Sequence, residues 1–245
     1  MTEKQLLILQ TGGLPDSTPE ILDRFGDMGD IFLTPTGLDD QNSLILRLHE
    51  GELPNTDPQD YAGILITGSP LMLSCPSAWM IDIGPWLQDA IKKKVPTLGV
   101  CFGHQLLAHA LGGKIGPNPN GLEAGTVSVE FSAARKDDPL FSLLSDEPLF
   151  QVHHYESILE LPEGAEVLAR NAHENYHAVR FGPMAWSIQF HPEISVELIR
   201  TLLMTDKENL LTNGYEPDRI LAGLQDTPEG PALLQRFRDI AFGRV

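Results

Sequence analysis

The sequence is poor in cysteine and in positive charge. Cys75 and Cys101 are the only cysteines among its 245 residues, which is too few for a disulfide framework and typical of a reducing compartment. Its 17 lysine and arginine residues are outnumbered by 34 aspartate and glutamate residues, so the formal net charge is −17. Because such a surface repels phosphate, we expect neither a nucleic acid nor an anionic membrane as a partner.

Long apolar runs are also missing. The first run, residues 6–9, is too short for the apolar core of a signal peptide, and no run approaches the roughly 18 residues of a membrane span. We therefore expect a cytoplasmic protein. Hydrophobic residues still make up 42% of the chain, which is enough for a large core, and we find no internal repeat or low-complexity tract.

What the sequence does contain is an alternation of apolar runs and helical patterns. Helical patterns begin at Thr18-Pro19, cover about fifteen residues before Lys92–Lys94, and cover residues 101–111. Between them lie strand-like runs at residues 6–9, 31–33, 64–66 and 95–100. Continuous apolar strands between helices are typical of a parallel sheet that is covered on both faces.

The second half of the chain has a different pattern. Helical stripes fill the region after His191, and closely spaced strand-like runs precede it at residues 126–131, 149–152, 165–169, 176–181 and 185–190. We predict an α/β fold with an open, mostly parallel, twisted sheet, helices on both faces (flavodoxin-like), an antiparallel strand addition and a C-terminal helical tail. The main domain is expected at residues 1–194, with a helical extension at 195–245 packed on it.

Residues 98–105 carry the strongest chemical signal. A predicted strand runs directly into a predicted helix at Gly99-x-Cys101-x-Gly103, the cysteine form of a nucleophile elbow. This geometry places Cys101 at the carboxyl edge of the sheet, where the helix N-terminus favours a thiolate. The backbone N–H of Phe102 can form half of an oxyanion hole, and Gln105 lies one turn further on the same helix face. We predict Cys101 as the nucleophile and Cys75 as a structural cysteine.

A second signal follows the last strand-like run. Pro192 keeps His191 extended, so His191 and Glu193 point to the same side of the chain. A carboxylate beside an imidazole fixes its tautomer and stabilises its protonated form. We predict His191 as the base and Glu193 as its orienting partner. A third, weaker signal is the strand break at Gly68-Ser69-Pro70, whose backbone amides can supply a second oxyanion donor.

Together these segments resemble the class I glutamine amidotransferases. The segments 68–70, 99–105 and 191–193 occur in that family's order, and residues 111–114 and 154–164 are similar to its GMP-synthetase-type branch. The resemblance implies that Cys101 attacks the side-chain amide of glutamine, and that water hydrolyses the γ-glutamyl thioester after ammonia leaves. It implies backbone oxyanion donors at Ser69 and Phe102, and no metal or cofactor. Expected substrate-binding residues are Gly68, Gln105, His153, His154 and Tyr155.

Two functions remain open at this point. The first is a glutaminase that releases ammonia for a separate synthetase, because the chain has no room for a synthetase module and no Walker-A motif. The second is a stand-alone γ-glutamyl hydrolase or peptidase with the same triad. It is favoured by departures from the branch at Ser69, His153 and Tyr155, where bulky Tyr155 replaces a glycine. The tail would then cover the face used by a synthetase, or form a homodimer.

Other classes fit the residues less well. A binding or scaffold protein would not need Cys101, His191 and Glu193 together. A metal site at His153-His154, or at His173 and His177, lacks a cysteine or carboxylate cluster to complete it. An ordinary α/β-hydrolase has the order nucleophile, acid, base, whereas here the histidine precedes the glutamate.

Overall fold

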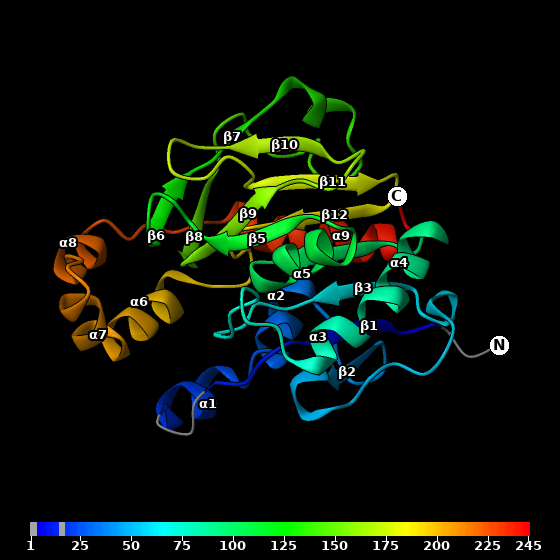
Figure 1. Cartoon of the computed structure of the whole chain (residues 1–245), viewed down its shortest axis with the longest axis horizontal. Coiled ribbons are helices and arrows are strands. Elements are labelled where there is room, and N and C mark those ends of the chain that lie inside the picture. Colours follow the sequence, from blue (N-terminus) through cyan, green and yellow to red (C-terminus); the bar gives the residue numbers. More distant parts are fainter. Residues whose placement is uncertain (1–3, 15–17) are drawn as a thin grey trace.

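The computed structural model describes residues 4–14 and 18–245 and confirms the α/β fold (Figure 1). Its centre is an eight-stranded sheet in the order β2-β1-β3-β4-β12-β11-β10-β7. The first five strands run parallel to one another: β2 (Ser43–Arg47), β1 (Leu6–Gln10), β3 (Gly63–Ile66), β4 (Thr97–Val100) and β12 (Ala185–Ile188). The predicted antiparallel addition follows as β11 (Ala178–Gly182), β10 (Glu166–Arg170) and β7 (Glu130–Phe131).

Two short antiparallel ribbons lie outside this sheet. One pairs β5 (Lys114–Pro117) with β9 (Glu156–Glu160), and the other pairs β6 (Glu123–Ser128) with β8 (Leu149–His154). The second ribbon brings His153 and His154 toward the carboxyl edge of the main sheet, because Gln151 of β8 forms an isolated bridge with His191 just after β12.

Alternating side chains of β1 show why both faces of the sheet are covered. Leu6 and Ile8 enter a core with α9 (Glu229–Ala241), whose apolar stripe contributes Leu233, Leu234, Phe237 and Ile240. Leu7 and Leu9 enter a second core on the other face, with α4 (Gly84–Lys92) and α5 (Phe102–Ala110). This alternation follows from the two-residue period of a strand.

The C-terminal extension contributes to two different cores. The helices α6 (Val196–Thr205), α7 (Lys207–Thr212) and α8 (Pro217–Ala222) share a separate apolar cluster with Ile21 of α1 (Pro19–Phe25). Figure 1 shows these helices on the side of the molecule toward which β3 points. The α9 helix instead returns across the sheet and completes the first core. The boundary at residues 194 and 195 stays a prediction.

Residues 31–33 do not form the predicted strand. They belong to a short 3₁₀ turn, η1 (Asp30–Phe32), and to the start of α2 (Leu33–Thr36). The Thr36 hydroxyl donates to the carbonyl of Phe32, and Gly37 ends α2 in a left-handed conformation with φ 69°. Three apolar residues do not distinguish a strand from a helical turn, and here the local turn geometry favours the turn.

The predicted fifteen-residue helix spans the expected stretch, residues 78–92, but it is divided into two helices. The chain forms α3 (Ala78–Asp82) and then α4, because Pro85 lacks a backbone N–H and begins a new helix. The sequence analysis overlooked β2, β5 and β9. Strand β2 lies at the sheet edge with mostly half-buried side chains, and β5 contains Gly116 and Pro117, so neither has a strong strand pattern. The other predicted strands and helices are confirmed within a few residues.

Candidate active site

Cys101 lies at the turn between β4 and α5, in an unusual backbone conformation. Its φ of 52° and ψ of −102° leave it left-handed, which a non-glycine residue rarely adopts. The Cys101 backbone N–H donates to Ile188 of the neighbouring strand at 2.8 Å, which helps to hold this turn against the sheet. Such strained backbone is typical of catalytic positions, because the surrounding structure must fix it.

The two glycines beside Cys101 are required by close packing. A Cβ at Gly99 would lie 2.4 Å from the carbonyl oxygen of Gly103, and a Cβ at Gly103 would lie 2.5 Å from that of Ile66. The first turn of α5 therefore touches both β4 and β3. Only glycine permits this approach at positions 99 and 103.

His191 and Glu193 lie beside Cys101. The His191 Nδ1 and the Glu193 Oε1 are 2.6 Å apart, and the side chains of both residues are less than a tenth exposed. A Cβ at Gly68 would lie 3.0 Å from His191 Cε1 and 3.6 Å from Cys101 Cβ, so the imidazole and the thiol converge over this glycine. The Cys101 thiol is also close enough to the imidazole to affect its pKa. The structure thus brings the three predicted triad residues together.

The charge state of His191 follows from these contacts. Burial by itself would lower the pKa of the imidazole. The charges of Glu193 and Cys101, and hydrogen bonds with both, outweigh burial and raise the pKa of His191 well above its usual 6.5. This arrangement favours a protonated His191 next to Cys101.

Two backbone amides are available at the predicted oxyanion positions. Among the described residues, the N–H groups of Ser69 and Phe102 have no protein acceptor. The loop at Gly68-Ser69 is held in place because the hydroxyls of Thr11 and Thr67 donate to the Gly68 carbonyl at 2.8 and 2.9 Å. The loop is therefore rigid while its amide remains free, as a preorganised donor requires.

A cavity of about 480 Å³ opens at this edge of the sheet and exposes Cys101 and His191. The loop after β3 supplies an apolar wall with Leu71 and Met72, and the start of the chain adds Leu14 and Met28. The C-terminal extension contributes Leu202, Thr205, Asp206 and Asn209 to the lining. The described part of the chain contributes no lysine or arginine to this lining.

Four of the five predicted substrate-binding residues line the cavity and fall into two groups, whereas Gly68 lies against His191 and Cys101. His153 and Tyr155 line the cavity, and the carbonyl of His153 lies 3.9 Å from Cys101 Sγ. Burial, with a smaller effect of His191, lowers the pKa of the His153 imidazole to about 4, so this ring is neutral near pH 7. These two side chains are placed to contact a ligand.

Gln105 and His154 also line the cavity, but their polar atoms are largely engaged within the protein. The Gln105 Nε2 donates to the carbonyl of Glu156 at 2.7 Å and to Gln189 Oε1 at 3.1 Å. The His154 Nε2 lies 2.9 Å from Glu123 Oε2, and its Nδ1 lies 3.1 Å from the Glu156 carbonyl. Both therefore stiffen the wall of the cavity.

Sequence reasoning missed several residues of this site. Gln189 Nε2 donates to Cys101 Sγ at 3.5 Å, and its position two residues before His191 on a strand could have indicated it. The Glu156 carboxylate accepts from the amides of Leu73 (2.7 Å) and Ser74 (3.2 Å), so it fixes the loop after β3. The lining residues of the extension, such as Asp206, carried no local signal.

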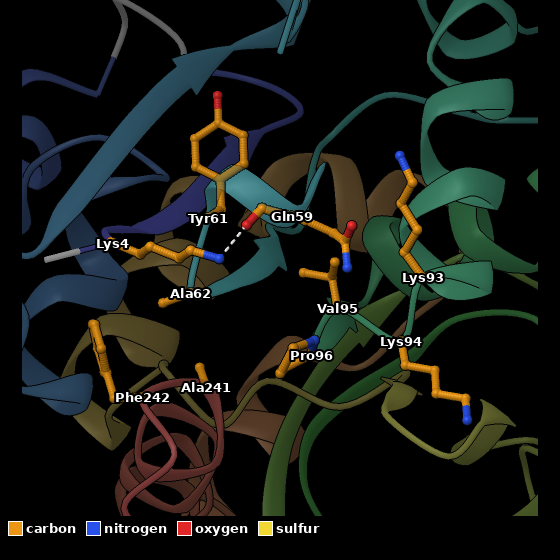
Figure 2. Close-up of a pocket in the computed structure, with 10 residues that line it drawn as sticks. All are labelled: Lys4, Gln59, Tyr61, Ala62, Lys93, Lys94, Val95, Pro96, Ala241 and Phe242. Atoms are coloured by element: carbon orange, nitrogen blue, oxygen red, sulfur yellow. Dashed lines mark hydrogen bonds between the residues drawn. The ribbon is translucent and has the colours of Figure 1, made fainter. Parts of the chain in front are cut away.

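A second cavity, of about 350 Å³, lies at the opposite edge of the sheet (Figure 2). Lys4, Ala62 and Pro96 line it just before β1, β3 and β4, and Lys4 donates to the carbonyl of Gln59. Lys93, also in its lining, pairs with Asp57 outside the cavity at 2.7 Å. None of the predicted catalytic residues reaches this edge.

Two kinds of feature are absent from residues 4–14 and 18–245. In these ranges no group of three or more histidine, cysteine, aspartate or glutamate side chains could hold a metal ion. His177, one of the histidines considered for such a site, instead lies 3.2 Å from Glu123. No helix in these ranges is both long and apolar enough to cross a membrane.

Comparisons with known proteins relate this site to characterised families. The chain is 30% identical to gamma-glutamyl peptidase 5 of Arabidopsis thaliana over 212 residues, which cover 80% of this chain and 84% of that protein. It is 33% identical over 144 residues to the glutamine-hydrolysing GMP synthase of Porphyromonas gingivalis, covering 57% of this chain and 27% of that enzyme.

The fold is shared with solved structures as well. A glutamine amidotransferase from Thermotoga maritima superposes with a TM-score of 0.76 at 18% identity, over 99% of both chains. The family model for class I glutamine amidotransferases matches residues 43–208, which include the elbow and the His-Pro-Glu segment. With the geometry at Cys101, these matches lead to one conclusion: the chain belongs to the class I glutamine amidotransferase family.

Proposed function

We propose that this protein hydrolyses the γ-amide bond of a γ-glutamyl compound through the triad Cys101, His191 and Glu193. The observation that carries the proposal is the convergence of Cys101 and the His191–Glu193 pair over Gly68 in one cavity. A nucleophile, a base and an orienting carboxylate in this order are the parts that acyl transfer needs.

In the first half of the reaction, the Cys101 thiolate attacks the γ-carbonyl carbon. The negative charge on the carbonyl oxygen is stabilised by the backbone N–H groups of Ser69 and Phe102. His191 then gives its proton to the leaving nitrogen, and the C–N bond breaks. The products of this half are the free amine, or ammonia, and a γ-glutamyl thioester on Cys101.

In the second half, water replaces the amine. Neutral His191 takes a proton from the water as it attacks the thioester carbonyl, and Glu193 stabilises the imidazolium that forms. The C–S bond breaks, which releases the γ-carboxylic acid and restores the thiolate–imidazolium pair. The acid then loses its proton to the solvent or to the freed amine. The same two backbone amides serve both tetrahedral intermediates.

We propose a stand-alone hydrolase or peptidase as the form of this activity. The similarity to gamma-glutamyl peptidase 5 extends over four fifths of each chain, whereas the similarity to the GMP synthase covers about a quarter of that enzyme. The cavity of about 480 Å³, walled by the C-terminal extension, is in the size range of sites for ligands larger than glutamine. Tyr155 narrows the part expected to hold the glutamyl head.

The second candidate is a glutaminase that releases ammonia for a separate synthetase. It is supported by the 33% identity to the glutamine-hydrolysing GMP synthase over residues that overlap the family model. This candidate requires a partner chain, because the match covers only 27% of the enzyme. The two functions share the triad and differ in the preferred substrate.

Hydrolysis by the purified chain distinguishes the candidates. Release of glutamate is measured from free glutamine and from a panel of γ-glutamyl amides and peptides, with Cys101→Ser as the inactive variant. Cys75→Ser is the matched control, because Cys75 is exposed and lies outside the cavity. A stand-alone hydrolase cleaves peptides faster than glutamine, and only Cys101→Ser loses the activity. Cleavage that survives in Cys101→Ser would overturn the proposal.

A further inference from the structure

The C-terminal extension brings a single carboxylate into the cavity of Cys101. Asp206 lies between α6 and α7 and is half-buried in the cavity wall. The Asn209 Nδ2 donates to its Oδ1 at 3.1 Å. Within residues 4–14 and 18–245 it forms no ion pair, and the adjacent Lys207 binds Asp218 at 2.6 Å instead.

The other charged groups around the cavity already have partners. Glu193 lies 2.6 Å from His191, and Glu156 accepts from the amides of Leu73 and Ser74. His154 lies 2.9 Å from Glu123 behind the wall. The described lining has no lysine or arginine. Asp206 is therefore an uncompensated negative charge, and a cation is the ligand group that complements it.

Asp206 acts on the two residues expected to contact the glutamyl head. Its charge opposes the lowering of the His153 pKa and, after burial, is the next cause of a raised pKa at Tyr155. The rings of His153 and Tyr155 are 6.1 Å apart. Leu71 and Met72 of the loop after β3 add apolar side chains to the lining. Asp206 thus lies near the two residues expected to hold the glutamyl head, and Leu71 and Met72 give the lining an apolar part that is left for the amine product.

We propose that Asp206 binds the α-ammonium group of the γ-glutamyl substrate. The inference rests on the proposed function and narrows its substrate class to γ-glutamyl amides that have a free α-amino group. It further predicts that the leaving group of the substrate is apolar and contacts Leu71 and Met72. A γ-glutamyl compound acylated at its α-nitrogen has no cation for Asp206 and is a poor substrate.

Covalent labelling of Cys101 tests this contact without requiring turnover. Two reagents are compared in a Cys75→Ser background: the chloroketone analogue of glutamine, which carries an α-ammonium group, and the same chloroketone without its amino group. The labelling rate of the peptide that contains Cys101 is measured by mass spectrometry. Asp206→Asn keeps the size of the side chain and removes its charge.

We expect Asp206→Asn to slow labelling by the amino chloroketone roughly 10- to 100-fold, the worth of a hydrogen bond to a charged group. Labelling by the des-amino reagent should change less than about threefold. Glu208→Gln is the matched control, because Glu208 lies on α7 but does not line the cavity, and it should leave both rates unchanged. Equal slowing with both reagents, or no slowing with either, overturns the assignment of Asp206.

This design separates the inference from the proposed function. If γ-glutamyl peptides are cleaved but Asp206→Asn does not discriminate the two reagents, the hydrolase stands and the role of Asp206 is wrong. If labelling discriminates but no γ-glutamyl compound is cleaved, Asp206 binds the ammonium group of a different acyl donor and the hydrolase proposal fails. Asp206→Asn could also slow cleavage only of amides that have a cationic leaving group. That result would mean that Asp206 contacts the leaving group, and it would overturn the assignment of Asp206 to the α-ammonium group.

Discussion

At the scale of single residues, Glu193 determines the charge of its neighbour. Its carboxylate lies 2.6 Å from His191 Nδ1, in surroundings from which water is nearly excluded. Burial disfavours the imidazolium, so a raised pKa at His191 requires the opposing charges of Glu193 and Cys101. The position of Nδ1 therefore depends on Glu193, and the protonation of the ring depends on Glu193 together with Cys101.

Replacing Glu193 should lower the pKa of His191 and reduce catalysis. In Glu193→Gln the hydrogen bond can persist, but the negative charge that favours the imidazolium is gone, so His191 loses its proton at a lower pH than in the wild type. We expect kcat/KM for a γ-glutamyl amide to fall roughly 10²- to 10⁴-fold. The titration of His191, followed by NMR of its ring nitrogens, measures the shift. Glu197→Gln, an exposed glutamate on α6, is the control. An unchanged His191 titration in Glu193→Gln contradicts this account.

A second prediction concerns the elbow. In Gly103→Ala the new Cβ would lie 2.5 Å from the Ile66 carbonyl, so β3 and α5 must separate. We expect a loss of about 1–3 kcal/mol in the free energy of unfolding. Activity should fall at least about tenfold, because Ile66 leads into the loop of Ser69. Urea unfolding and kcat/KM check both. Gly84→Ala, whose Cβ has its nearest neighbour at 4.0 Å, should be nearly neutral. Wild-type values for Gly103→Ala would refute the packing argument.

The residues of the proposed triad could be singled out from the sequence because their signals are local. Cys101 lies between two glycines at a strand–helix junction, and His191 and Glu193 are separated only by Pro192. Gln189 and His154 were harder to interpret, since their roles depend on partners 88 and 31 residues away, Cys101 and Glu123. Sequence spacing does not reveal such partners.

At the scale of elements, Asp138 ties the antiparallel strands to the rest of the sheet. Its fully buried carboxylate accepts from Trp186 Nε1 of β12 at 3.0 Å and from Arg180 Nη1 of β11 at 3.1 Å. It also accepts from the amides of Leu140 (2.9 Å) and Phe141 (3.2 Å) in the following turn. One side chain thus joins two strands and a loop.

Removing this carboxylate should destabilise the whole domain. Asp138→Ala leaves the buried Trp186 N–H without its acceptor, while Arg180 keeps its ion pair with Glu166. We expect a loss of about 1–3 kcal/mol in the free energy of unfolding. Asp137→Ala is the matched control, because Asp137 is exposed and adjacent in sequence. Urea denaturation of both variants decides the point. Equal stabilities of the two variants would mean that Asp138 does not hold the strands together.

Elements with continuous apolar runs could be predicted, and elements with mixed patterns could not. Strands β1, β3 and β4 are fully buried, and the apolar runs of β1 and β3 are unbroken over residues 6–9 and 64–66. The edge strand β2 has mostly half-buried side chains, so its sequence does not show a clear alternation of apolar and polar residues. Residues 31–33 show the opposite case: their three apolar residues predicted a strand, but they lie in a helical turn that ends at Gly37. A strand that is buried on both faces can be predicted from the sequence because nearly all of its side chains are apolar.

At the scale of the whole molecule, the C-terminal extension completes the main core and also lines the cavity. Its sequence does not show which helix has which role. Both α6 and α9 have amphipathic stripes, yet α9 completes the main core while α6 joins the smaller cluster that walls the cavity. The helical tail was predictable from its periodicity. Which face of the sheet each helix covers depends on contacts with β-strands about 200 residues earlier, and these leave no local pattern.

The folded protein also buries histidines in a neutral form, and this should make it sensitive to acid. His104 on α5 is fully buried, with its Nδ1 2.6 Å from Ser187 Oγ of β12. Burial, followed by the effects of His177 and His154, lowers the pKa of His104 to about 3. Between the unfolded value of 6.5 and about 3, the unfolded chain therefore binds a proton that the folded chain does not. The stability contributed by neutral His104 is present above pH 6.5 and is lost as the pH falls through this window.

Replacing His104 should reduce by about one the number of protons that the chain takes up when it unfolds in this pH range. We expect the slope of the unfolding free energy against pH, measured by urea titrations between pH 4 and 6, to be smaller in His104→Asn by about 1.4 kcal/mol per pH unit. Asparagine can keep the hydrogen bond to Ser187, and the comparison uses slopes, so a constant loss of stability does not affect it. His109→Asn, at the partly exposed end of the same helix, tests whether loss of any histidine gives this result. A wild-type slope in His104→Asn would mean that the buried imidazole takes up its proton without unfolding, and that acid stability is set elsewhere in this acidic chain.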